Sequence, residues 1–69
     1  MNKTTIKNAL KRTAGGAEFI TQGDIKRSLH CGNDRAAEIV KGLEYFKIGR
    51  TKKYDVEEVA SAIYAYVEQ

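Results

Sequence analysis

The sequence has no proline, no tryptophan, one cysteine and one histidine among its 69 residues. A single cysteine excludes a disulfide within the chain, and one cysteine with one histidine is too small a set for four-ligand zinc coordination. We therefore expect neither a metal nor another cofactor, and we interpret Cys31 as a small, half-buried residue at a corner. So short a chain has room for one thin domain, and we assign residues 1–69 to it.

Long apolar runs are also missing. Met1 is not followed by the apolar stretch of a signal peptide, and no segment approaches the length that spans a membrane. We expect a protein of the reducing cytoplasm with no membrane partner. Twelve Lys and Arg residues against nine Asp and Glu give a modest net charge of +3. Because this value alone does not indicate an anionic partner, the evidence for one has to come from the positions of the charges along the chain.

Sets of catalytic side chains are absent too. The sequence offers no histidine–carboxylate–nucleophile set and no cluster of metal ligands. The pairs Gly15-Gly16 and Gly49-Arg50 lack the surrounding residues of a nucleotide-binding loop. We therefore predict that the chain is not an enzyme.

The first regular pattern predicts an N-terminal helix within residues 1–14. Ile6, Ala9 and Leu10 recur on one helical face, beside a stripe of lysines that we interpret as a solvated rim. The glycine pair that follows supplies the left-handed dihedrals that end a helix.

Residues 19–56 predict a helix-turn-helix followed by a wing. Thr21, three residues before Asp24, is typical of a capped helix start. Ile25 and Leu29 lie four residues apart, and we expect both to face inward from this short first helix.

A corner and a second helix follow directly. Gly32 permits the positive φ of a sharp corner, and Asn33 is a good N-cap. The strongest apolar periodicity in the chain then predicts a buried stripe at Ala36, Ile39, Val40 and Leu43. The opposite arc would lie in the DNA major groove, where base edges carry a full donor–acceptor code. The side chains predicted to contact DNA from this arc are Asn33, Arg35, Ala37, Glu38 and Lys41.

Among these residues, Arg35 is the best candidate for a bidentate contact to guanine. Two acids on the same arc count against a DNA contact. Asp34 has a structural role, because a carboxylate in the first turn complements the helix dipole. Glu38 has no such role unless it accepts from a cytosine amino group or orients Arg35.

The densest basic cluster comes next, in a predicted β-hairpin with its tip at residues 49–52. Phe46 and Ile48 share one side of the outgoing strand, and a short strand within residues 17–20 is expected to pair with this wing. Cations on such a hairpin follow the DNA backbone, with strong salt dependence and little base selectivity. The predicted wing contacts are Lys47, Arg50, Thr51, Lys52 and Lys53.

A last helix is predicted over residues 56–67. Asp55, with Glu58 three residues later, forms a capping-box pattern. Tyr64 and Tyr66 flank the apolar stripe, as core or rim residues or as a self-association surface. The expected buried stripe is Val56, Val59, Ala60, Ile63 and Val67.

In order and spacing, these features resemble the excisionase-like winged helix-turn-helix proteins of phages and integrative elements, which are relatives of the MerR-type DNA-binding domain. The resemblance covers roughly residues 19–63. It rests on the Gly32-Asn33 corner, the Lys47-Ile48-Gly49-Arg50 wing closed by Tyr54, and the segment 55–60 after the wing. The N-terminal helix and the acids at positions 34 and 38 depart from the family pattern.

The resemblance implies a fold that is mainly α with a small β wing: a winged helix-turn-helix with an N-terminal helix, three further helices and a two- or three-stranded hairpin sheet. It also implies a recombination directionality factor. Such a protein binds and bends double-stranded DNA at an attachment site, associates cooperatively with its own copies there and assists a separate integrase. A transcriptional regulator of a phage or mobile element stays open, as does a protein-interaction adaptor that has lost DNA binding.

Overall fold

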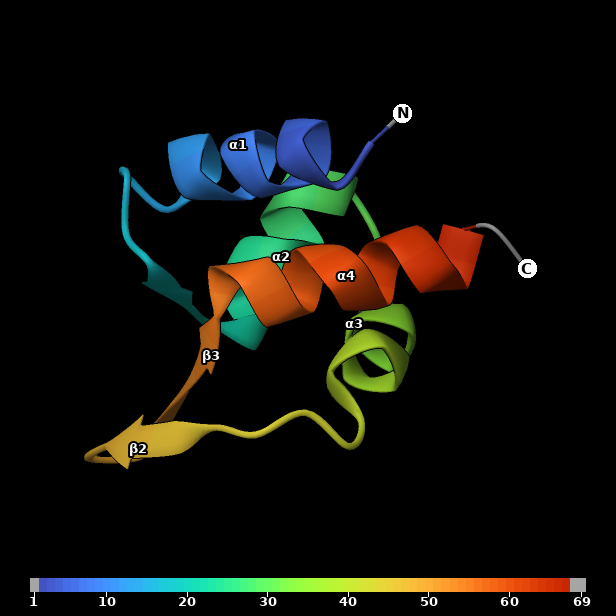
Figure 1. The fold of residues 1–69 in the computed structure, drawn as a ribbon. Helices are drawn as coiled ribbons and strands as arrows, with labels where there is room; N and C mark the ends of the chain where they lie inside the picture. Colours follow the sequence, from blue (N-terminus) through green and yellow to red (C-terminus); the bar gives the residue numbers. More distant parts are fainter. Residues whose placement is uncertain (1, 68–69) are drawn as a thin grey trace.

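The computed structural model describes residues 2–67, which form four helices and a three-stranded antiparallel sheet (Figure 1). The predicted mainly helical class is confirmed, and the arrangement is compatible with a winged helix. Positions 1, 68 and 69 of the predicted domain lie outside the described residues. In chain order the elements are α1 (Lys3–Thr13), β1 (Phe19–Ile20), α2 (Gln22–Leu29), α3 (Asn33–Val40), β2 (Phe46–Ile48), β3 (Thr51–Asp55) and α4 (Val56–Val67).

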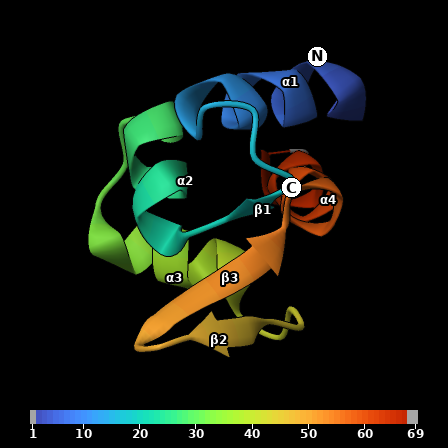
Figure 2. The same cartoon turned by 90° about the vertical axis from the view of Figure 1, so that its left-hand side faces the viewer.

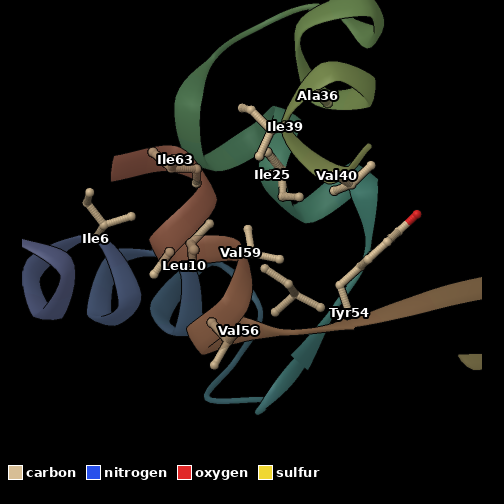
Figure 3. Close-up of a cluster of buried hydrophobic side chains, with 12 residues drawn as sticks. Ile6, Leu10, Ile25, Ala36, Ile39, Val40, Tyr54, Val56, Val59 and Ile63 are labelled. Carbon is tan, nitrogen blue, oxygen red and sulfur yellow. The ribbon is translucent and has the colours of Figure 1, made fainter. Parts of the chain in front are cut away.

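The helices pack around α4. α1 and α3 lie on either side of it, and α2 contacts both α1 and α3 (Figures 1 and 2). Their apolar stripes meet in one core (Figure 3). The largest fully buried side chains are Leu10, Ile25 and Val59 from the helices and Ile20 from β1. Burial of each such side chain stabilises the fold by about 1.5–3 kcal/mol. Within residues 2–67 no helix is long and apolar enough to cross a membrane.

Local signals set the end of α1 and the start of α2 as predicted. Gly15 and Gly16 have φ of 70° and 89° and follow the end of α1. At the start of α2, the Thr21 hydroxyl accepts from the N–H of Asp24, and the Asp24 carboxylate accepts from the N–H of Thr21. This reciprocal capping box confirms the predicted helix start.

The corner between α2 and α3 differs from the prediction. The left-handed residue is His30, with φ of 52°, whereas Gly32 has φ of −81°. Gly32 is the N-cap of α3 and Asn33 is its first helical residue, so the prediction of an Asn33 cap was wrong. The reason is that α2 closes at His30, whose N–H donates to the Lys26 carbonyl, and the chain has turned before it reaches the glycine.

α3 is shorter than the apolar periodicity indicates. It ends at Val40, and Lys41 has φ −59° and ψ 124°, outside the helical region, so the prediction of Lys41 within the helix was wrong. Gly42 then adopts φ of 85°, a conformation that is strained for residues with a side chain. This residue turns the chain away from the axis of α3. Leu43 still packs against the core, half-buried, from the loop beyond the helix.

Two predicted core residues are exposed. Leu29 is 40% exposed and Val67 is 61% exposed. Each is the last residue of its helix, where the apolar stripe runs past the elements that cover it. Helical periodicity therefore placed both residues on the apolar face of their helices, but it did not predict that no neighbouring element covers the ends of these faces.

β3 is the central strand of the sheet, with β1 on one edge and β2 on the other. This confirms that the short strand before α2 pairs with the wing. Ile48 pairs with Thr51, so the turn contains only Gly49 and Arg50. Gly49 has φ of 62° and Arg50 does not share this positive φ, as in a type II′ hairpin turn. The predicted four-residue tip was therefore too long.

The start of α4 is capped differently from the prediction. The Asp55 carboxylate accepts from the N–H of Glu57 at 2.9 Å. Within residues 2–67 the return bond from Glu58 that would complete a capping box is not formed. Asp55 is also the last residue of β3. Its pairing with Phe19 keeps the backbone of Asp55 in the sheet while its carboxylate caps α4.

Candidate nucleic-acid interface

The wing, formed by β2 and β3, carries its cations on two different faces. Side chains alternate between the faces of a strand, and cross-strand partners share a face. The register pairs Lys47 with Lys52, next to the turn residue Arg50. These three residues form what we call the basic face of the wing. Lys53 pairs with Phe46 and lies on the opposite face, so the structure separates it from the other predicted wing cations.

The Lys47–Lys52 pair is a like-charge pair directly across the ladder, which destabilises a hairpin. Within residues 2–67, neither lysine nor Arg50 forms an ion pair with an acid. The Nζ of Lys52 lies 4.8 Å from the ring centroid of Tyr45, whose ring packs on that of Tyr54. An aromatic face holds an ammonium group without removing its charge. The basic face therefore presents uncompensated positive charge on a positioned support.

The basic face continues onto the N-terminus of α2, beside the turn of the wing (Figure 2). The N–H groups of a first helical turn have no partner within the helix and carry partial positive charge. Backbone donors and two cations thus border one hollow, and such a combination suits the oxygens of a phosphate group. The hollow measures about 360 Å³, and its lining includes Thr21, Gln22 and Gly23 from the helix start and Arg50, Thr51 and Lys52 from the wing.

α3 and the wing project on the same side of the molecule, away from α1 (Figures 1 and 2). Asn33, Ala37 and Glu38 are exposed on α3, and Lys41 is exposed just beyond its end. The structure therefore brings the predicted helix residues and the basic face to one side of the fold.

Arg35 is the exception among the predicted helix residues. Its Nη1 donates a 2.7 Å hydrogen bond to the hydroxyl of Tyr66 on α4. This bond, together with the nearby charge of Glu38, raises the pKa of Arg35 above its ordinary value. Arg35 and Ala37 lie about 200° apart around the helix. Arg35 is thus on the flank of α3 that faces α4, and a guanine contact by this residue stays a prediction that requires exchange of the bond to Tyr66.

The exposed surface of α3 also carries the acids Asp34 and Glu38. Carboxylates repel phosphates, so α3 itself attracts a DNA backbone less strongly than the wing does. The wing and the start of α2 are consequently the strongest candidates for affinity.

Sequence reasoning missed Gln22, Gly23 and Tyr45 as parts of this surface. The Thr21 capping signal marks a helix N-terminus, where free N–H groups are always present, so the first two residues could have been found. Tyr45 directly precedes the wing, but its contact with Lys52 depends on a register that the sequence does not specify.

Within residues 2–67 no three His, Cys, Asp or Glu side chains lie close enough together to hold a metal ion. Comparisons with protein-family models, with curated proteins and with solved structures found no match for this chain. The functional interpretation therefore depends on the geometry and charge of the surface just described.

Proposed function

We propose that the chain is a winged helix-turn-helix protein that binds double-stranded DNA through the basic face of the wing, the start of α2 and α3. The observation that supports this most strongly is the Lys47–Lys52 pair. Two lysines directly opposite each other destabilise the isolated protein. A phosphate backbone placed against them turns that repulsion into attraction and releases counterions.

In this proposal the wing and α2 bind the phosphates. Lys47, Arg50 and Lys52 neutralise charge, and the free N–H groups of Gln22 and Gly23 donate to phosphate oxygens. Such contacts fix the position of the protein on the duplex but carry little sequence information. Lys53, on the other face, acts only through its long-range field.

Base selectivity then depends on α3 and the residue that follows it. Asn33 has the donors and acceptors for adenine, and Ala37 fits the methyl group of thymine. Glu38 can accept from a cytosine amino group, which gives this acid a favourable partner in the groove. Lys41, exposed just beyond the helix, has the cation for a contact to guanine or to a phosphate.

The resemblance supports an excisionase-like role, in which the protein binds and bends attachment-site DNA and assists a separate integrase. A mobile-element transcriptional regulator would use the same surface, and the position of the gene beside an integrase gene distinguishes an excisionase from such a regulator. A protein-interaction adaptor is the candidate from another class. The acids Asp34 and Glu38 on the exposed arc of α3 favour it, because they oppose a phosphate backbone.

Fluorescence anisotropy with a short random-sequence duplex, at several salt concentrations, tests DNA binding. Affinity of the wild type should fall linearly on a log–log plot against salt. The variant Lys47→Gln/Lys52→Gln should bind more weakly at every salt concentration, with a slope shallower by about two. The matched control Lys3→Gln/Lys11→Gln removes the same charge from α1, on the far side of the molecule, and should keep the wild-type slope.

Equal losses in the two double variants would show that net charge alone drives binding, and this would contradict the assigned surface. No binding of the wild type even at low salt would contradict DNA binding altogether and would leave the adaptor as the better candidate.

A further inference from the structure

The outer face of the sheet, opposite the basic face, carries three large apolar side chains that are partly exposed. The register pairs Phe19 with Asp55 and Phe46 with Lys53, so these side chains share one face with Ile48. Phe19 is 47% exposed, Phe46 is 45% exposed and Ile48 is 63% exposed. We call this surface, made of these five residues, the outer face.

Phe19 and Phe46 are the two phenylalanines of the chain, and neither lies in the core. They come from strands on opposite edges of β3, and their rings meet edge to face, with centroids 5.1 Å apart and planes at 78°. This contact favours one arrangement of the two rings across the sheet. An exposed, pre-organised aromatic pair of this kind is typical of a binding surface.

Carboxylates border the aromatic pair. A hollow of about 210 Å³ opens beside Phe19 and Phe46, with more acidic than basic groups around it. Within residues 2–67, Glu44 and Glu58 form no ion pair, so their charges are available to a partner. The charged residues that line this hollow are Glu44, Asp55 and Glu58 against one cation, Lys53.

We propose that the outer face binds a basic segment of another protein. A large apolar side chain of that segment enters the hollow beside Phe19 and Phe46, and flanking Lys or Arg residues pair with Glu44 and Glu58. Because the outer face and the basic face lie on opposite sides of the same sheet, the protein can hold DNA and this partner at the same time.

The charges distinguish this occupant from two others. DNA is disfavoured because the acids beside the hollow repel phosphates. A second copy that presents the same face about a two-fold axis would bring the two sets of acids together, which also disfavours it. A basic, apolar segment satisfies both the aromatic pair and the acids.

An NMR titration of the isotope-labelled protein tests the proposal. The probe is a synthetic peptide of alternating Lys and Leu, and the comparison peptides replace Lys by Glu or Leu by Ser. The Lys/Leu peptide should give saturable shifts at the backbone amides of Phe19, Phe46 and Asp55, and both comparison peptides should bind at least tenfold more weakly.

Two variants and two matched controls locate the site. Phe19→Ser/Phe46→Ser and Glu44→Gln/Glu58→Gln should each weaken binding of the Lys/Leu peptide by tenfold or more. Leu29→Ser removes another exposed apolar side chain, and Asp34→Asn/Glu38→Gln removes two acids from α3. Both control variants should bind the Lys/Leu peptide with the affinity of the wild type. The glutamate variant leaves the aromatic contact intact, so the test does not depend on the fold of the phenylalanine variant.

Four outcomes would overturn the proposal. They are equal binding of the Glu/Leu peptide, shifts confined to other surfaces, shifts at the outer face on addition of duplex DNA, and a dimer in sedimentation that Phe19→Ser/Phe46→Ser abolishes. The third would assign the face to DNA and the fourth to a second copy. None of these outcomes decides whether the basic face binds DNA, which the salt series measures separately.

Discussion

Lys47 and Lys52 face each other directly across the β2–β3 ladder, and within residues 2–67 no acid pairs with either of them. Two like charges in this position oppose folding of the hairpin. The same two charges are the centre of the surface that we propose for DNA. Removal of one of these charges should therefore raise the stability of the protein and lower its affinity for DNA.

Lys47→Glu should reveal both effects. It converts the like-charge pair into an opposite-charge pair, and we expect the free energy of unfolding to rise by about 0.5 kcal/mol while affinity for DNA falls. Urea denaturation and anisotropy on the same preparation measure the two effects. Lys47→Gln, which removes the repulsion and adds no attraction, should lie between wild type and Lys47→Glu in stability. A loss of stability in Lys47→Glu would show that the repulsion is not significant.

The same substitution should have opposite effects at two glycines. Gly32 has φ of −81° and open space where a Cβ would lie, so Gly32→Ser adds a hydroxyl that can cap α3 without strain. We expect a gain of about 0.5 kcal/mol. Gly49 has φ of 62°, so Gly49→Ser should cost about 1 kcal/mol although no atom obstructs it. Thermal melts of the two variants make the comparison, and equal shifts would contradict the assigned turn geometry.

Two leucines should differ greatly in their contribution to stability. Leu10 is 1% exposed between α1 and the rest of the core, whereas Leu29 is 40% exposed. Leu10→Ala should lower the free energy of unfolding by about 3 kcal/mol, and Leu29→Ala by less than about 1 kcal/mol. Chemical denaturation measures both. A small effect at Leu10 would mean that α1 is dispensable for the fold.

Arg35 and Tyr66 should act as one unit in stability. If their hydrogen bond joins α3 to α4, then Arg35→Ala and Tyr66→Phe should each lower Tm slightly, and the double variant should lose little more than either single variant. A double-mutant cycle in thermal melts measures this coupling. Additive losses would indicate that the bond does not contribute, and Arg35 would then be free to contact a base.

Local chemistry explains which parts of the fold the sequence predicts. Thr21 and Asp24 lie three residues apart and cap α2 with their own side chains. The start of this helix is therefore determined by a few neighbouring residues and can be predicted from them. The end of α3 was harder to predict. The apolar periodicity continues to Leu43 and Gly42 favours an end of the helix at that position, but the chain leaves the helix at Lys41, one residue earlier.

Tertiary relationships explain what the sequence did not predict. Arg35 meets Tyr66 across 31 residues of sequence, and no local pattern signals this contact. The face on which each wing cation lies depends on the register of the strands. A shift of one residue would move Lys53 to the basic face and Lys52 to the opposite face. The cations of the wing could thus be found in the sequence, but the faces on which they lie could not.

An NMR titration of the labelled protein with a short random-sequence duplex at low salt tests DNA binding by the wing and the start of α2 most directly. We expect the largest shifts at the backbone amides of Lys47, Lys52, Gln22 and Gly23, with smaller shifts along α3 and none along α1. Shifts centred on α1 or on the outer face, with the wing amides unchanged, would contradict DNA binding by this surface.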